Sequence, residues 1–200
     1  MSVEPRAQLA RRNLKTVGAL AALFFLPVLI AFYMYYGGTW RPAARTNHGE
    51  LLQPARPLPR AELHTDAGTV APPDVFTSKW ALIYIGDGAC DEVCKTTLYF
   101  MRQTRLSLNN EMTRVSRVFL ATASCCNREF LEREHPGLLV LDASGPEAAE
   151  LLKVFPLTDR TRSLFITDPL GNLVMRYDAR ENPKGLLEDL KKLLKLSHIG

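Results

Sequence analysis

The sequence has few cysteines and few histidines, four of each in 200 residues, and it contains no internal repeat. No segment places cysteines in the two-pair spacing of a structural zinc site, which excludes that class of small metal domain. The basic residues do not gather into a patch with interleaved aromatic residues, and the net charge is only +4. A nucleic-acid partner is therefore not expected.

Charged residues are absent from one long stretch, residues 16–36, which reads TVGALAALFFLPVLIAFYMYY. As a helix this stretch would be about 31 Å long, enough to cross the hydrocarbon core of a bilayer. Basic residues precede it and aromatic residues crowd its far end, so we expect the N-terminus in the cytoplasm and the rest outside. The stretch is long for a signal peptide and no small-residue cleavage site follows it closely, so we expect an uncleaved anchor.

Composition divides the chain into four expected parts. These are a cytoplasmic tail (1–15), a transmembrane anchor (16–36), a linker rich in proline and arginine (37–74) and one domain (75–200). The last part is of ordinary domain size and long enough to bury a hydrophobic core.

Apolar runs within 75–200 predict an alternation of strands and helices. We expect buried strands near 80–85, 118–121 and 138–141, each followed by a helix. A hairpin is expected over 163–177, because Asp168, Pro169 and Gly171 suit a type I turn. Asn182 and Pro183 then begin a closing helix. Parallel crossovers followed by a hairpin predict an α/β sandwich of thioredoxin-like architecture, with a central mixed sheet flanked by helices.

Cys90 and Cys94 lie in the segment WALIYIGDGACDEVC, where the first of these strands meets a turn and then a helix. Residues i and i+4 on a first helical turn face the same way, with Cα atoms about 6 Å apart. That separation suits a disulfide, and it also lets two sulfurs hold one soft metal ion. The pair therefore predicts dithiol chemistry, either redox or Cu(I) binding.

Two segments resemble the Sco/SenC proteins, membrane-anchored factors that help to load copper into the CuA centre of cytochrome c oxidase. They are GDGACDEVCKTTL (86–98) and TDRTRSLFITDPLG (158–171), within a resemblance that covers residues 75–195. It implies one N-terminal span, a thioredoxin-like domain, copper, and Cys90 and Cys94 as both the redox-active and the metal-binding residues. It also implies oxidase subunits or other assembly factors as partners, and a bacterial inner membrane with the C-terminal domain in the periplasm.

The sequence departs from the Sco/SenC pattern at three positions. The family places its third copper ligand, a histidine, nine residues before the hairpin proline, and counting back from Pro169 gives Arg160. An arginine has no lone pair to donate to copper. Asp91 and Lys95 also stand where the family has prolines after each cysteine. The chain thus resembles a divergent subgroup that lacks the copper-ligand histidine. Three roles stay open for Arg160: it pairs with Asp159, it holds the thiolates electrostatically, or it is an ordinary surface arginine.

Other cysteines and histidines leave several roles open. Cys125 and Cys126 follow the second strand and are resolving thiols, further copper ligands or incidental residues. Each histidine is a candidate replacement ligand, although each alone is typical of a solvated side chain: His48, His64, His135 and His198.

The leading interpretation is an assembly factor for a copper-containing cytochrome c oxidase. It would use Cys90 and Cys94 to carry Cu(I) or to reduce the cysteines of a partner's copper site. One alternative is an enzyme, a general thiol–disulfide oxidoreductase, although no proline precedes the strand at Ser163 as it does in ordinary thioredoxins. The other alternative is a non-catalytic scaffold that docks to an oxidase subunit through its span or linker.

Overall fold

The computed structural model of the chain describes residues 4–37, 46–123, 127–178, 180–197 and 199. It contains two compact units that divide between Thr46 and Asn47. The first unit is the helix α1 (Glu4–Tyr36), which includes Pro27. Its stretch Asn13–Tyr36 has a mean hydropathy of 2.3 and none of it is buried, so it is long and apolar enough to cross a membrane.

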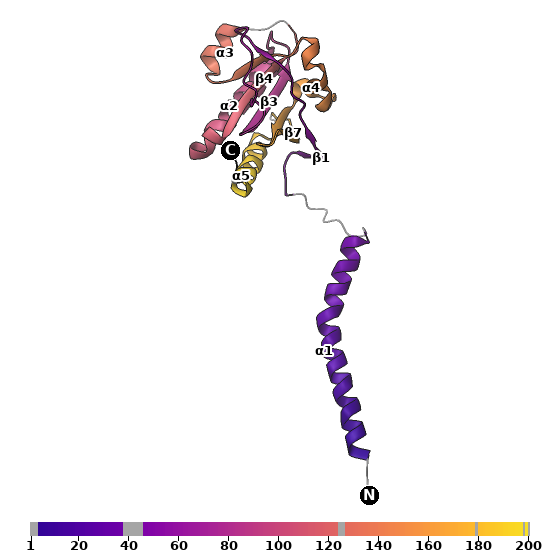
Figure 1. The fold of residues 1–200 in the computed structure, drawn as a ribbon. Helices are drawn as coiled ribbons and strands as arrows, with labels where there is room; N and C mark the ends of the chain where they lie inside the picture. The colour runs from indigo at the N-terminus through magenta and orange to yellow at the C-terminus, as the bar shows by residue number, and fades with distance from the viewer. Residues whose placement is uncertain (1–3, 38–45, 124–126, 179, 198, 200) are drawn as a thin grey trace. The chain divides into compact units, whose positions relative to one another are not determined.

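The second unit is built on one mixed sheet of seven strands in the order β1-β7-β6-β3-β4-β5-β2 (Figure 1). The strands are β1 (Glu50–Pro57), β2 (His64–Thr65), β3 (Trp80–Gly86), β4 (Val115–Ala121), β5 (Leu139–Asp142), β6 (Leu164–Thr167) and β7 (Asn172–Tyr177). The inner strands β3, β4 and β5 are parallel, whereas β6 runs antiparallel to β3 and forms a hairpin with β7. Every residue of β3 is buried, as expected for a strand covered on both faces.

Helices cover both faces of the sheet. The α-helices are α2 (Glu92–Leu106), α3 (Arg128–Glu134), α4 (Ala149–Val154) and α5 (Pro183–Leu196), and the short 3-10 helices are η1 (Asn109–Arg114), η2 (Pro146–Ala148) and η3 (Arg160–Arg162). Residues of α2, α3 and α5 share one hydrophobic cluster with Tyr84 and Phe119. Residues of α4 share a second cluster, on the opposite face, with Ile83 and Phe165. The order of elements after Trp80 confirms the predicted thioredoxin-like α/β sandwich.

The structure corrects the boundary expected between linker and domain. Strands β1 and β2 both lie within the expected linker (37–74), and the second unit begins at Asn47. β1 pairs with β7 at one edge of the sheet, and of its eight residues only Leu52 is buried. Prolines are tolerated on an edge strand because one side of its backbone faces solvent. The prolines that suggested a linker are therefore compatible with a strand at this place.

A buried carboxylate fixes the start of the second unit to its last helix. Asp189 of α5 accepts hydrogen bonds from the backbone N–H groups of His48 (2.5 Å) and Gly49 (3.1 Å) and from the Tyr177 hydroxyl. Burial raises the pKa of Asp189, but these hydrogen bonds outweigh that effect and hold the pKa below its usual value. The carboxylate is therefore charged at neutral pH and ties the first residues of the unit to α5 and β7.

Candidate functional site

The site forms where β3 ends and the chain turns into α2. Gly86 is the last residue of β3, and a Cβ atom at this position would lie 2.7 Å from the Tyr84 hydroxyl. Only glycine leaves room for the Tyr84 ring there. The next residue, Asp87, accepts a hydrogen bond from the Ala89 N–H (2.9 Å), and Asp87 O accepts one from Cys90 N (3.1 Å). These bonds close a tight turn that brings Cys90 in front of the helix.

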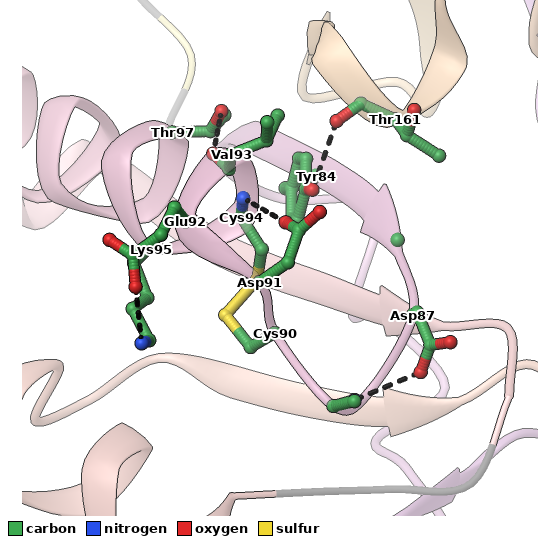
Figure 2. Close-up of a disulfide and its surroundings, with 12 residues drawn as sticks. Tyr84, Asp87, Cys90, Asp91, Glu92, Val93, Cys94, Lys95, Thr97 and Thr161 are labelled. Carbon is green, nitrogen blue, oxygen red and sulfur yellow. Dashed lines mark hydrogen bonds and ion pairs between the residues drawn. A yellow bond between two sulfur atoms is a disulfide. The ribbon is translucent and has the colours of Figure 1, made fainter.

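Cys90 and Cys94 form a disulfide, with their Cα atoms 5.0 Å apart (Figure 2). The sequence predicts both cysteines on the first turn of a helix, and this is wrong for Cys90. Helix α2 begins at Glu92, and Cys90 precedes it in a left-handed conformation with φ of +50°. Cys90 belongs to the tight turn after Gly86, whose backbone is not helical, so the i, i+4 spacing of a helix does not apply to it. Cys94 alone lies in the first turn.

Asp91 caps helix α2, a role that the sequence analysis missed. Its Oδ1 accepts a hydrogen bond from the Cys94 N–H (2.9 Å), as Figure 2 shows. Aspartate is among the preferred N-cap residues, so its place just before Glu92 was a usable signal. The negative charge lies directly beside the disulfide. It disfavours thiolates at Cys90 and Cys94 and therefore favours the oxidised pair. Lys95 is paired with Glu92 at 2.7 Å and does not offset that charge.

The disulfide is buried, whereas the sequence predicts a pair that projects into an open cleft. Each cysteine is only 2% exposed. Cys90 and Cys94 both belong to the hydrophobic cluster around α2, which explains their burial. A pocket of about 340 Å³ nevertheless reaches Cys94, and its other lining residues are Tyr84, Asp87, Ala89, Asp91, Val93, Thr161 and Arg162. Access to the pair is therefore narrow and leads to Cys94.

Tyr84 holds the segment η3 at this pocket. Its hydroxyl donates a hydrogen bond to the Thr161 carbonyl (3.0 Å), which joins the end of β3 to the segment before β6 (Figure 2). Burial and the nearby Asp91 carboxylate raise the Tyr84 pKa well above its usual value, and Arg180 only partly opposes them. Tyr84 is therefore a neutral hydrogen-bond donor at all physiological pH values.

Arg160 neither holds the thiolates nor pairs with Asp159. Its guanidinium donates to the carbonyls of Leu152 (2.8 Å) and Phe155 (2.9 Å), where helix α4 ends. Terminal carbonyls of a helix lack partners within the helix, and a cation satisfies them well. Burial lowers the Arg160 pKa from its usual value. Arg162, two residues later, lines the pocket beside Cys94 instead.

No described histidine replaces the missing copper ligand, since none lines the pocket at Cys94. His48 lies before β1, and its Nε2 atom is 2.9 Å from a carboxylate oxygen of Glu188 in α5. His64 lies on β2 at the far edge of the sheet, and His135 ends helix α3. His198, Cys125 and Cys126 lie outside the described residues, so their proposed roles stay predictions.

The donor atoms at the site decide which copper state would fit. Among the described residues, no group of three or more His, Cys, Asp or Glu side chains is arranged to hold a metal ion. Two thiolates suffice for Cu(I), which accepts two soft ligands, whereas Cu(II) prefers additional nitrogen donors. The reduced cysteine pair therefore fits Cu(I) and does not fit a three-ligand Cu(II) site.

Comparisons with known proteins agree on the fold. Residues 80–197 match the family described as "Transmembrane-like, thioredoxin-like, C-terminal domain". Sco1 from Thermus thermophilus is 24% identical, with a TM-score of 0.60 over 76% of this chain and 100% of that chain. Yeast Sco1 is 19% identical, with a TM-score of 0.62 over 73% and 98% of the two chains. Copper-bound ScoI from Bradyrhizobium japonicum is 18% identical, with a TM-score of 0.54 over 68% and 98%.

A comparison with curated proteins finds no match. The family match covers more than half of the chain, and the similarity to the Sco structures independently supports the thioredoxin-like sandwich. The chain belongs to the transmembrane-like, thioredoxin-like C-terminal domain family, and its thioredoxin-like fold is similar to that of the Sco1 structures.

Proposed function

We propose that this protein is a membrane-anchored, Sco-like factor that assists assembly of a copper-containing cytochrome c oxidase by thiol–disulfide exchange. The observation that carries the proposal is the Cys90–Cys94 disulfide at the end of β3, with a pocket that reaches Cys94. The resemblance of residues 86–98 and 158–171 to the Sco/SenC proteins supports the assignment to oxidase assembly, and the similarity to Sco1 structures supports the shared fold. Cys90 and Cys94 are the proposed redox-active residues.

The exchange transfers two electrons and two protons to the partner. In the reduced protein, one thiolate attacks a partner disulfide and forms a mixed disulfide, and one partner thiolate leaves and takes up a proton. The second thiolate then attacks the mixed disulfide, which releases the second partner thiol and closes Cys90–Cys94. An external dithiol reductant must afterwards restore the reduced pair. The partner is then a protein with two reduced cysteines ready for copper.

We infer that Cys94 makes the first attack, and the lining of the pocket supports this inference. Cys94 lines the pocket and Cys90 does not, so a partner sulfur entering there meets Cys94 first. We expect Cys90→Ser to accumulate a mixed disulfide with an oxidised cysteine-bearing probe peptide, because the second thiol that would resolve it is missing. Cys94→Ser, the matched variant, should accumulate far less. Equal trapping by the two variants, measured by mass spectrometry, would contradict this assignment.

Cu(I) is a second candidate, as cargo of the reduced pair. Two observations favour it: two sulfurs lie close enough to bind one ion, and Sco proteins of the same fold from yeast and Bradyrhizobium japonicum have been solved with copper bound. The reduced chain in non-ionic detergent should bind one Cu(I) in competition with a chromogenic chelator. Cys90→Ser should abolish this binding, and an unchanged stoichiometry in that variant would remove the copper role.

We also infer that α1 anchors the protein in a bacterial inner membrane, with its N-terminus in the cytoplasm and the second unit in the periplasm. The apolar stretch of α1 supports a span, and the basic residues before it support this orientation: Arg6, Arg11, Arg12 and Lys15. An oxidising compartment also suits a disulfide-forming pair. Added protease should cut the second unit in spheroplasts without lysis, and protection there would reverse the orientation.

A further inference from the structure

Arg117 of β4 is a buried cation on the α2 face of the sheet. It is only 4% exposed. Its Nη2 donates to the Pro136 carbonyl (2.6 Å), whereas Nε and Nη1 are buried and meet no acceptor among the described residues. A buried guanidinium without a counter-charge is strongly destabilising, because the charge has lost its hydration and gained no compensating anion. A charge of this kind is normally paired with an anion.

Two more arginines stand beside Arg117. Arg105 of α2 donates from Nε to the Val115 carbonyl (2.7 Å), and Val115 precedes Arg117 by two residues on the same face of β4. Arg102 lies one helical turn before Arg105 and makes no hydrogen bond or ion pair with any described residue. Burial, followed by the charges of Arg105 and Arg102, lowers the Arg117 pKa to about 10.

The turn after α3 closes the third side of this group. His135 is 5% exposed, and its Nδ1 meets no partner in the part of the chain that the structure describes. Burial and then Arg117 lower its pKa to about 4, so the imidazole is neutral and adds no charge. We call Arg102, Arg105, Arg117 and His135 the arginine cluster.

No carboxylate of the described residues balances the arginine cluster. Among the described residues, no Asp or Glu lies within the 4.0 Å ion-pair distance of Arg102, Arg105 or Arg117. Glu134 is next to His135, but it is exposed and pairs with Arg133 (3.0 Å). The undescribed positions of the second unit carry no Asp or Glu side chain either. The described residues therefore leave this positive charge without a counter-charge.

We propose that the arginine cluster is a binding site for a phosphate group. Guanidinium groups bind phosphate through charge-assisted hydrogen bonds, and Arg117 Nε and Nη1 are two donors that no described residue accepts from. A phosphate carries more than one negative charge, whereas a single carboxylate would leave most of the positive charge of the three arginines unbalanced. Arg102 has no described partner to lose when a ligand binds. None of these residues takes part in the proposed thiol–disulfide exchange, so the phosphate proposal does not depend on the proposed redox function.

The proposal is tested with the full chain in nanodiscs of phosphatidylcholine. Thermal unfolding is followed while inorganic phosphate is added, with chloride replaced so that ionic strength stays constant. We expect a saturable rise in Tm. Arg102→Gln should weaken the phosphate affinity about tenfold, because one charge-assisted pair is lost. Arg133→Gln, which removes the same charge from an exposed site on α3, should keep the wild-type affinity.

The variant comparison also protects the test against a folding defect. Arg117→Met is expected to abolish the phosphate response, but this change replaces a buried side chain and can also impair folding. Arg102 is only half-buried, so the phosphate affinity of Arg102→Gln can be measured on a folded protein. Equal responses in Arg102→Gln and Arg133→Gln, or no response in the wild type to phosphate or to lipid, would overturn the site. Nanodiscs with phosphatidic acid, whose phosphomonoester carries more than one negative charge, distinguish the source: an Arg102-dependent rise in Tm without added phosphate identifies a lipid headgroup, and a response to inorganic phosphate alone identifies a soluble one.

Discussion

At the scale of single residues, the direction of each side chain decides its role. Counting back from the hairpin proline correctly located Arg160 in the segment beside the disulfide. The guanidinium of Arg160 turns to the carbonyls of Leu152 and Phe155, and Thr161 and Arg162 line the pocket instead. Neither orientation could be predicted from the sequence. Tyr84 is a similar case: its apolar run predicts a buried strand residue, but its bond to Thr161 depends on the tertiary fold. Pattern reasoning thus found the site and missed its hydrogen bonds.

A prediction at this scale concerns His135, whose folded-state pKa of about 4 lies well below the usual 6.5. A histidine with a lowered pKa resists protonation in the folded state, so the unfolded state binds the proton first as the pH falls. The contribution of neutral His135 to the free energy of unfolding is fully present above pH 6.5 and is progressively lost between pH 6.5 and 4. From pH 7 to pH 5 we expect a loss of about 2 kcal/mol from this group.

Urea unfolding of the chain in non-ionic detergent at pH 7 and pH 5 measures this loss. His135→Gln should remove most of the difference between the two pH values. His64→Gln, at an exposed position on β2, should retain it. An identical pH dependence in the wild type and His135→Gln would show that the buried imidazole is not responsible.

At the scale of elements, periodicity predicts those segments whose burial is regular. Strand β3 is buried throughout and α5 carries its leucines at helical spacing, and both appear where they are expected. β1 was missed because only Leu52 of its eight residues is buried, so no alternation marks it. The segment before α2 was misjudged because helical spacing was extended backwards to Cys90, whereas Asp91 is the N-cap and the helix begins at Glu92. Edge strands and caps depend on hydrogen bonding more than on hydrophobicity.

The cap of α2 gives a prediction at the element scale. Asp91→Ala should lower the free energy of unfolding of the oxidised protein by about 1 kcal/mol, because the Cys94 N–H loses its acceptor. Asp91→Asn should keep most of that stability, since asparagine caps helices equally well. The Asp91→Asn change also removes the charge beside the cysteines, so the reduction potential measured against glutathione should become less negative in this variant. Equal potentials in the wild type and in Asp91→Asn would contradict the electrostatic role given to this carboxylate.

The contact between β3 and η3 gives a second element-scale prediction. Tyr84→Phe removes the hydroxyl that bonds to Thr161, a bond worth about 1 kcal/mol. The segment η3 should then open more often, and dithiothreitol should reduce the Cys90–Cys94 disulfide about fivefold faster. Tyr99→Phe, at an exposed position on α2, is the matched control and should leave the rate unchanged. A rate in Tyr84→Phe that equals the wild type would show that η3 does not limit access.

At the scale of the whole molecule, the thioredoxin-like sandwich was predictable because each element's pattern agreed with one topology. The order of strands and helices after Trp80 left few ways to connect them. Burial of the cysteine pair was not predictable, because it results from the packing of α2 on the sheet and not from any local signal. The arginine cluster also brings together α2, β4 and the turn after α3, which are separate in the sequence. Its charges become one site only in the folded unit.

The most direct test of the proposed function is cytochrome c oxidase activity in membranes of cells whose only copy of this protein carries Cys90→Ser and Cys94→Ser. Immunoblotting of the same membranes must show that the variant accumulates normally. We predict that oxidase activity falls to the level of a strain that lacks the protein, because neither electrons nor Cu(I) can pass through the cysteine pair. Full oxidase activity with normal accumulation would contradict the proposal and would leave the protein as a non-catalytic scaffold.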